Sequence, residues 1–412
     1  MGFLRTIALA ILGFSTFVFI VLFGRLPVFR KTPIGLFHRA IWIHFPNGVA
    51  YLDSCLFGGR FLGFWRRAGS YIFFENHPLV LIFFTSLLFI GEAIFVPSAW
   101  PRVSLIHHFC IPVAVGLPYY YLYASVVTKS FITPENHAEE MKRYPYDKVI
   151  FHPGHRCSTC DFLKPARSKH CSHCEGCIAR HDHHCVWLTN CVGLNNYRYF
   201  LSLLLSLSVM LVYGSCLGYS LITKSFDALI PPTSPVRMRK QSWTTFLNMW
   251  AAVVASDPRV GGVTMLMCMT APLAFAFFVY HTYLIWAGMT TNESAKWSDW
   301  KDDVADGIAF RLFDAEDMSK SPLIRSPGLT SSWPGSSAQM LVLTEGEPPR
   351  EGFRLYERSN DIIQPSNADA PIDRKFVRVR SMKEIDNIYD LGFWNNVRHV
   401  FETCAEKGTH ND

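Results

Sequence analysis

The chain has 412 residues, of which 50% are hydrophobic and 15% aromatic, whereas only 17% carry charge. An ordinary soluble domain carries charge on about a quarter of its residues, and a disordered chain has too few apolar residues to form a core. The net charge of +6 comes from 39 basic and 33 acidic residues spread along the chain, so it gives no sign of a nucleic-acid-binding surface. A membrane protein is the class that fits this composition.

Five windows are long and apolar enough to cross the hydrocarbon core of a bilayer, which takes about 20 residues in a helix. In chain order they are residues 6–23, 78–98, 105–127, 199–222 and 260–289. The first window follows a short basic start, so it also fits a secretory signal peptide. No small-residue cleavage pattern follows it, and we therefore predict an N-terminal transmembrane helix over residues 1–23.

Residues 24–77 mix aromatic and basic residues without a clean span, which favours helices that lie in the bilayer interface. A short extra pair of membrane helices is the alternative. Positive residues are retained on the cytosolic side, so the seven basic residues of 24–77 and the ten of 128–198 place both segments in the cytosol. The loop at 223–259 argues for the opposite orientation with its basic residues, but it also carries acidic ones.

The predicted architecture is an α-helical polytopic membrane protein with four to five spans and a small cytosolic zinc-binding domain between them. Its parts after residue 77 are a transmembrane hairpin at 78–127, the cysteine-rich domain at 128–198, two spans with a lumenal loop at 199–289, and a cytosolic tail at 290–412. Residues 319–349 are rich in Ser, Pro and Gly, which predicts a disordered linker. Residues 389–401 have apolar residues at helical spacing, and we expect them to dock on the membrane or on the cysteine-rich domain. No internal repeat of fixed period is apparent.

Seven of the 12 cysteines lie within 35 residues, between Cys157 and Cys191. Beside histidines in a large membrane chain, such density favours a metal site over disulfides, and hence a reducing, cytosolic face. Two pairs have the two-residue spacing that presents both sulfurs to one tetrahedral ion. The pairs are Cys157 with Cys160 and Cys171 with Cys174, and the residues available to complete two shells are Cys177, Cys191, His170 and His184. Six sulfurs and two nitrogens suit two structural zinc ions with no open position.

One cysteine of this cluster, Cys185, is left over, and it follows Asp182, His183 and His184. A thiol beside an imidazole and a carboxylate has what a nucleophile requires, because the imidazole takes the proton and the carboxylate orients the ring. Metal binding without catalysis is the commonest role of paired cysteines. The leftover thiol favours instead a zinc-built frame for one reactive sulfur.

From Cys157 to Phe200 the sequence follows the pattern C-x2-C-x9-HC-x2-C-x2-C-x4-DHHC-x5-C-x4-N-x3-F without a gap. With this pattern it resembles the DHHC family of membrane protein S-acyltransferases. Two further family motifs match: TTNE at 290–293, and a C-terminal element with Tyr389, Gly392 and Asn396. The resemblance implies an enzyme that transfers a long-chain acyl group from an acyl-CoA such as palmitoyl-CoA to protein cysteines.

The resemblance also assigns roles to single residues. It gives Cys157, Cys160, His170 and Cys177 to the first zinc ion, and Cys171, Cys174, His184 and Cys191 to the second. It implies that Asp182, His183 and Cys185 form a catalytic triad. It further implies that Thr290 or Thr291, with Thr291 preferred, hydrogen-bonds near Asp182, and that Asn396 anchors the tail against the membrane helices.

The stretch KPARSKHC at 164–171 departs from the commoner RPPRASHC form of the family. Together with the additional N-terminal span, it resembles the fungal branch that acylates SNAREs in the endoplasmic reticulum membrane, at cysteines beside their membrane segments. The implied partners are acyl-CoA, such membrane proteins and the lipid bilayer, and no nucleic acid. Four basic residues are candidates for the CoA phosphates or are solvated surface charges: Lys164, Arg167, Lys169 and Arg180. A membrane-anchored zinc module that binds partners without catalysis is the alternative function.

Overall fold

The structure is a computed structural model, and it describes residues 32–74, 78–229, 243–313, 341–344 and 375–402, with a few single positions outside these ranges. The chain divides into two compact units. One unit comprises residues 1–118 and 205–275, and the other comprises residues 119–204 and 276–412. The division therefore falls within three long helices rather than in loops.

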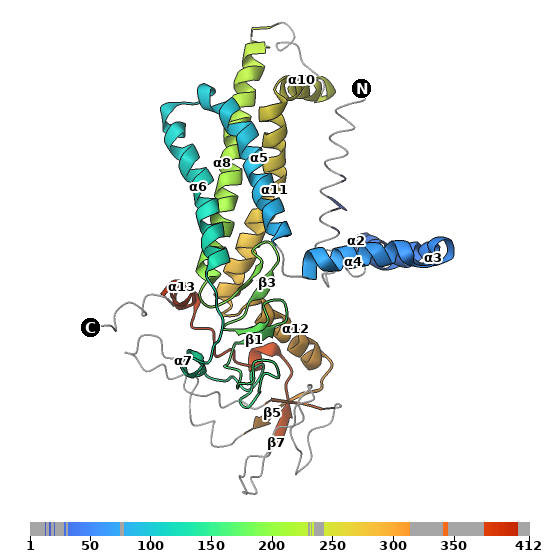
Figure 1. Cartoon of the computed structure of the whole chain (residues 1–412), viewed down its shortest axis with the longest axis vertical. Helices are drawn as coiled ribbons and strands as arrows, with labels where there is room; N and C mark the ends of the chain where they lie inside the picture. The colour runs from blue at the N-terminus through green and yellow to red at the C-terminus, as the bar shows by residue number, and fades with distance from the viewer. Residues whose placement is uncertain are drawn as a thin grey trace, which may run out of the picture. The chain divides into compact units, whose positions relative to one another are not determined.

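Four helical segments among the described residues are long and apolar enough to cross a membrane. They are Leu79–Arg102 (α5, Leu79–Ala99, continued by η3, Trp100–Arg102), Leu105–Val127 (α6), Tyr197–Leu229 (α8) and Pro258–Trp286 (α11) (Figure 1). Each overlaps a predicted window, which confirms the helical fold with four candidate membrane spans. The first predicted span, 6–23, lies outside the described residues apart from single positions.

The spans pack through a small core in the first unit, to which α10 (Trp243–Ser256) also contributes Val253. Helices α8 and α11 pack closely at Gly218. A Cβ atom at this position would overlap the side chain of Thr264. Gly214 lies one turn earlier and faces Met267 in the same way. Small residues four apart let membrane helices pack closely. Large apolar side chains such as Phe83 remain exposed on the spans, as contact with lipid requires.

The predicted interfacial segment forms a series of short helices. They are α2 (Pro33–Arg39), the π-helix η2 (Ala40–His44), α3 (Phe45–Phe57) and α4 (Arg60–Phe74). Helices α2, η2 and α3 follow one another without a break, so residues 33–57 form 25 helical residues, about 37 Å at 1.5 Å per residue, whereas the 15 residues of α4 reach about 22 Å. Buried Asp53 accepts hydrogen bonds from the N–H groups of Phe61 and Leu62 and so caps the start of α4. None of these helices is among the four described segments that are long and apolar enough to cross a membrane, and the interfacial location stays a prediction.

The second unit contains the cysteine-rich segment and most of the tail. Its paired short strands are β1 (Lys169–Cys171) with β2 (Gly176–Ile178) and β3 (His183–Cys185) with β4 (Asn190–Val192), and its short helices are α7 (His137–Arg143), α12 (Thr291–Ala305), η5 (Met382–Glu384) and α13 (Phe393–Glu402). A shared core joins Cys157 and Cys177 of the cysteine-rich segment to Val304 of α12 and Tyr389 of the tail. The cysteine-rich segment is therefore packed against the tail rather than standing alone.

A three-stranded antiparallel sheet in the tail was not predicted from the sequence. Its strand order is β6 (Leu341–Leu343), β5 (Ala309–Phe313) and β7 (Lys375–Arg378). Strand β6 lies inside the segment 319–349, for which we predicted disorder, so that prediction is wrong for these three residues. The apolar Leu-Val-Leu run pairs with β5, and Leu341 is buried. The rest of 319–349 lies outside the described residues, apart from Thr344.

The last span ends at Trp286, three residues before the predicted end at 289, because Gly288 stops the helix. Gly288 has φ 65°, and the N–H groups of Gly288 and Met289 bond back to Ile285 and Leu284. This is the Schellman pattern, which favours glycine. A Cβ atom at Gly288 would also overlap the backbone of Asp390. The tail therefore docks directly on the end of α11, within the same unit.

Candidate active site and metal centres

Three tight turns in the cysteine-rich segment repeat at an interval of 14 residues. Each turn has a residue in the left-handed conformation: Asp161 at φ 57°, Glu175 at φ 53° and Thr189 at φ 47°. An antiparallel pairing closes each turn: Arg156 with Leu163, His170 with Cys177, and His184 with Cys191. The expectation that the chain has no internal repeat was therefore wrong here. The repeat is carried by cysteine spacing and backbone conformation, while most other side chains differ.

These turns assemble the two predicted metal sets. In the first set, His170 Nδ1 lies 3.6, 3.4 and 3.9 Å from the sulfurs of Cys157, Cys160 and Cys177. In the second set, His184 Nδ1 lies 3.7, 3.4 and 3.6 Å from the sulfurs of Cys171, Cys174 and Cys191. A tetrahedral zinc ion with bonds of about 2.3 Å to sulfur and 2.0 Å to nitrogen places the nitrogen and each sulfur about 3.5 Å apart. The donor types, the number of donors and the distances therefore fit two closed zinc sites.

Strand β3 directs its three side chains to two sides. Side chains alternate along a strand, so His184 contributes to the second metal set while His183 and Cys185 share the opposite side. His183 interacts there with the thiol of Cys185. The thiol left over in the ligand count thus lies beside an imidazole.

Asp182 completes this group at the start of β3. Its Oδ2 atom lies 2.6 Å from His183 Nδ1, and its side chain is fully buried. Burial opposes ionisation of Asp182, but the hydrogen bond and the charge of His183 outweigh burial and hold the pKa of the carboxyl at about 2. Burial likewise opposes charging of His183, but its interactions with Asp182 and Cys185 raise the pKa of the imidazole to about 10. The arrangement favours a proton on His183 and a negative charge on Asp182.

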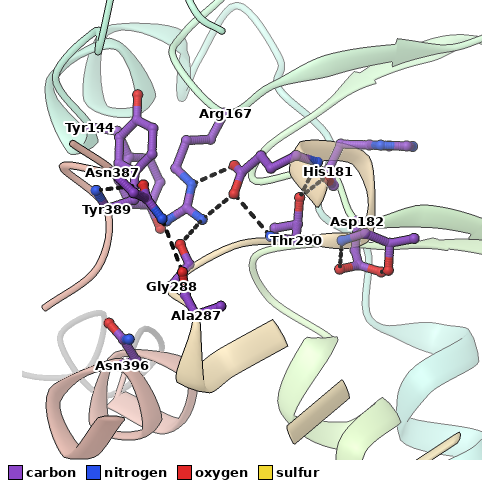
Figure 2. Close-up of polar contacts among 12 residues, drawn as sticks. Tyr144, Arg167, His181, Asp182, Ala287, Gly288, Thr290, Asn387, Tyr389 and Asn396 are labelled. Atoms are coloured by element: carbon purple, nitrogen blue, oxygen red, sulfur yellow. Dashed lines mark hydrogen bonds and ion pairs between the residues drawn. The ribbon is translucent and has the colours of Figure 1, made fainter. Parts of the chain in front are cut away.

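The first turn of α12 holds Asp182 in place (Figure 2). Thr291 donates two hydrogen bonds to the carboxylate, from its N–H to Oδ1 at 2.9 Å and from its Oγ1 to Oδ2 at 2.8 Å. The N–H of Asn292 donates to the Asp182 carbonyl at 3.1 Å. Thr290 contacts the neighbouring carbonyl of His181 instead, at 3.1 Å. Of the two threonines, Thr291 therefore meets Asp182 itself.

The role expected of Asn396 falls to another residue. The side chain of Asn396 accepts a hydrogen bond from the N–H of Leu391 and donates one to Asp390, so its bonds remain within the tail. Asn387 makes the bond to the last span, from its Nδ2 to the carbonyl of Ala287 at 3.0 Å (Figure 2). Asn396 therefore shapes the tail, whereas Asn387 attaches it. A single asparagine in a polar tail gives no sequence signal for this choice.

Residues from the spans also reach the Asp182–His183 pair, and the sequence analysis missed them. His281 of α11 is buried, its ring lies 5.9 Å from the His183 ring, and its Nδ1 lies 3.1 Å from the hydroxyl of Tyr197. The ring of Phe200 on α8 lies 5.5 Å from that of His183. A histidine inside an apolar span is a functional candidate by itself, and that signal was available.

The four basic residues considered for CoA binding lie in different environments. Lys169 is exposed and Lys164 half-buried. Arg167 and Arg180 are 1% and 6% exposed. Arg167 pairs with Glu293, so it is neither a solvated surface charge nor placed to meet a soluble phosphate.

Comparisons with known proteins point to one family. Residues 150–298, which include both metal sets and the first turn of α12, match the family model of the DHHC palmitoyltransferases. The chain is 72% identical over 410 residues to the palmitoyltransferase swf1 of Emericella nidulans, with 100% of each chain covered. It is 40% identical to the palmitoyltransferase SWF1 of Neurospora crassa, over 97% of this chain and 92% of the relative. The palmitoyltransferase ZDHHC4 of Bos taurus is 33% identical over 42% of this chain and 51% of its own length.

Proposed function

The chain belongs to the DHHC palmitoyltransferase family, and on this premise we propose that it transfers a long-chain acyl group from acyl-CoA to protein cysteines through a thioester on Cys185. The observation that carries the proposal is the geometry of β3. His183 and Cys185 share one side of the strand, with Asp182 Oδ2 at 2.6 Å from His183 Nδ1, while His184 belongs to a metal set on the other side. One strand thus holds both a structural ligand and the reacting groups.

In the first step, the sulfur of Cys185 attacks the carbonyl carbon of the acyl-CoA thioester while His183 holds the thiol proton. A new carbon–sulfur bond forms on Cys185, and the bond to the CoA sulfur breaks. The CoA sulfur leaves as a thiol after taking the proton from His183. Asp182 keeps the imidazole oriented throughout, because three hydrogen bonds from Thr291 and Asn292 fix its position.

In the second step, the thiol of a substrate cysteine gives its proton to His183 and attacks the acyl group on Cys185. The Cys185 sulfur leaves and recovers the proton, so the enzyme returns to its starting state. A thioester replaces a thioester in both steps. Catalysis therefore depends mainly on holding the donor, the thiol and the imidazole in one place.

We propose that the two metal sets bind one zinc ion each and act as structure. All four positions of each ion are filled by protein ligands, so a bound ion holds the turns together and takes no part in acyl transfer. The hairpins that it fixes are only three residues per strand. Strands this short need such support, because an isolated hairpin is marginal in water.

We propose that the acyl chain lies among the spans and the CoA group on the cytosolic side. Phe200 and His281, from α8 and α11, lie next to His183, so the reacting groups are at the ends of two spans. Burial of each methylene stabilises a bound acyl chain by about 0.8 kcal/mol. The site location also favours substrates whose cysteines lie beside a membrane segment. We propose SNAREs and similar single-span proteins of the endoplasmic reticulum membrane as substrates, on the resemblance of residues 164–171 to the fungal branch of the family.

The test is to incubate detergent-purified protein with a clickable palmitoyl-CoA analogue and to measure label that hydroxylamine removes. Wild type should carry such label, and Cys185→Ser should carry none while both retain two zinc ions per chain. This result would support an acyl-enzyme on Cys185. Equal label in both proteins, or no label in a zinc-replete wild type, would refute the Cys185 mechanism and favour a zinc module that binds partners without catalysis.

A further inference from the structure

A buried ion pair lies beside the residues that hold Asp182. Arg167 and Glu293 have side chains that are each 1% exposed. Nε and Nη2 of Arg167 donate to the two carboxylate oxygens of Glu293, both at 2.6 Å, and Nη2 also donates to the carbonyl of Gly288 at 3.2 Å (Figure 2). Two parallel hydrogen bonds between a guanidinium and a carboxylate fix both distance and direction.

The surroundings of Arg167 exclude a soluble ligand. The rings of Tyr144 and Tyr389 lie 5.2 and 4.5 Å from the guanidinium carbon, as in cation–π contacts. The hydroxyl of Tyr389 donates to the carbonyl of Pro145 at 2.7 Å, which holds this ring in place. The guanidinium therefore faces protein groups, so its task is internal.

Glu293 carries this anchoring into the first turn of α12. Its Oε2 atom accepts the N–H of Thr290 at 2.9 Å, while Thr290 Oγ1 accepts the N–H of Glu293 at 3.3 Å. This reciprocal pair is a capping box, which fixes the start of a helix. Thr290 Oγ1 also donates to the carbonyl of His181. The next residue, Thr291, binds the Asp182 carboxylate, so one peptide bond separates the cap from the groups that orient Asp182.

We propose that the Arg167–Glu293 pair is a positioning pair, which sets the start of α12 so that Thr291 and Asn292 hold Asp182 against His183. The proposal rests on the proposed function, since it requires Asp182 to orient a catalytic imidazole. Without Arg167, Glu293 is a buried carboxylate that has lost its hydrogen-bonded counter-charge, which is strongly unfavourable. Glu293 would then protonate or turn away, and the cap would loosen. A displacement of about 1 Å at a distance from the reacting atoms can lower a rate about 100-fold.

The test compares four variants of the full-length protein: Arg167→Gln, Arg167→Lys, Glu293→Gln and the double variant Arg167→Gln/Glu293→Gln. For each, formation of hydroxylamine-sensitive label is followed in a single turnover over a range of palmitoyl-CoA concentrations, which gives a maximal rate and a half-saturating concentration. Zinc content is measured on the same samples. The matched control is Arg143→Gln, alone and with Glu140→Gln, because Arg143 and Glu140 form a second two-bond ion pair in the same unit, on α7.

A positioning role predicts a change in maximal rate and not in donor affinity. We expect Arg167→Gln to lower the maximal rate by about 10–100-fold, with two zinc ions retained and an unchanged half-saturating concentration. Arg167→Lys keeps the charge but loses the two-pronged geometry, so its rate should fall by less. The double variant should be faster than Arg167→Gln alone, because no unpaired charge remains and two amides can still hydrogen-bond. The α7 controls should keep the wild-type rate.

Each other outcome has a separate meaning. A raised half-saturating concentration at unchanged maximal rate would overturn the proposal and assign Arg167 to CoA binding. An unchanged maximal rate in Arg167→Gln, or a double variant as slow as that single variant, would also overturn it. If Arg167→Gln loses zinc, the maximal rates of Arg167→Lys and of the double variant are compared with that of wild type instead. Wild-type rates in both variants would overturn the proposal, and lowered rates with two zinc ions retained would support it. A wild type without Cys185 label would instead overturn the proposed function, and the positioning role with it.

Discussion

The hairpins β1–β2 and β3–β4 of the cysteine-rich segment have the same strand pairing but carry different chemical groups. In β1–β2 His170 pairs with Cys177, and in β3–β4 His184 pairs with Cys191, so ligands occupy the same register 14 residues apart. The residue after each histidine is a cysteine. In the first hairpin this cysteine, Cys171, belongs to a metal set, whereas in the second hairpin Cys185 belongs to none of the sets formed by the described residues.

Three substitutions along the repeat account for the difference. Cys174, the partner of Cys171 at two-residue spacing, is matched by Leu188, so Cys185 has no second sulfur with which to hold an ion. Asp182 and His183 stand where the first hairpin has Ser168 and Lys169. Compared with the first hairpin, the candidate active site therefore lacks one cysteine ligand and has a carboxylate and an imidazole at two other positions. Under the proposed function, metal ions bound in the two sets would supply the rigidity that a reactive thiol at Cys185 needs.

The largest expected effect separates the two equivalent cysteines. Cys171→Ser removes a ligand of the second metal set, so we expect loss of at least one zinc ion, unfolding of the hairpins and loss of all activity. Cys185→Ser should abolish the acyl-enzyme but keep both zinc ions and the native melting temperature. Zinc analysis and thermal unfolding in detergent measure the difference. Two bound zinc ions in Cys171→Ser would break the comparison, because that cysteine would then also be a free thiol.

The second prediction compares the residues that precede the two histidine-cysteine steps. Asp182→Asn removes the charge that orients His183 and should lower the rate of acyl-enzyme formation at least about 100-fold. At the equivalent position, Ser168→Ala removes only a hydrogen bond to the Pro165 carbonyl. It should cost about 1 kcal/mol of stability and leave the rate near that of wild type. Equal rates of acyl-enzyme formation in the two variants would show that the Asp182 carboxylate does not contribute to the reaction.

The third prediction restores the missing ligand. Leu188→Cys recreates the two-residue spacing of the first hairpin, so Cys185 and the new thiol should bind a thiophilic ion such as cadmium together. We expect cadmium to block acyl-enzyme formation in Leu188→Cys at concentrations that do not affect Leu188→Ala. Both variants remove a buried leucine, which is expected to cost about 2–5 kcal/mol for the alanine, so they are matched for packing. Equal cadmium sensitivity would mean that the turn at Val186–Thr189 cannot present two sulfurs to one ion.

Much of the site was predictable because its signals are local in sequence. The spacing gave the two cysteine pairs and the residues available for two zinc shells, and the family resemblance assigned each ligand to its set. The leftover thiol at Cys185 with its neighbours gave the candidate catalytic group. Four of the five predicted windows coincide with helices that are long and apolar enough to cross a membrane, and α11 ends before the predicted residue 289 because Gly288 stops the helix. The 14-residue repeat was present in the sequence and was missed, because it is carried by turns and ligands alone.

The contacts between distant segments were not predictable from local patterns. Arg167 and Glu293 are 126 residues apart, and the local sequence around each residue does not indicate the other as its partner. From the sequence, Arg167 was a candidate either for the CoA phosphates or for a solvated surface charge, whereas in the structure it is buried between two tyrosine rings. In the same way, Asn387 and Asn396 differ only in what the folded tail places beside them.

The smallest expected effect concerns how each hairpin is fastened to its surroundings. Asn190 on β4 donates from Nδ2 to the carbonyls of Ser125 and Thr128, at 3.0 and 2.9 Å, and so satisfies the C-terminal end of α6. At the equivalent position of the first hairpin, Gly176 has no side chain and packs against Phe131. Asn190→Ala leaves the Thr128 carbonyl without this donor, while the Ser125 carbonyl keeps its hydrogen bond from Asn196, and the change should cost about 1–3 kcal/mol. The melting temperature in detergent should fall by a few degrees, while zinc content and acyl-enzyme formation stay close to wild type. A large loss of acyl-enzyme at full zinc content would contradict this and show that α6 positions Cys185 as well as anchoring the hairpin.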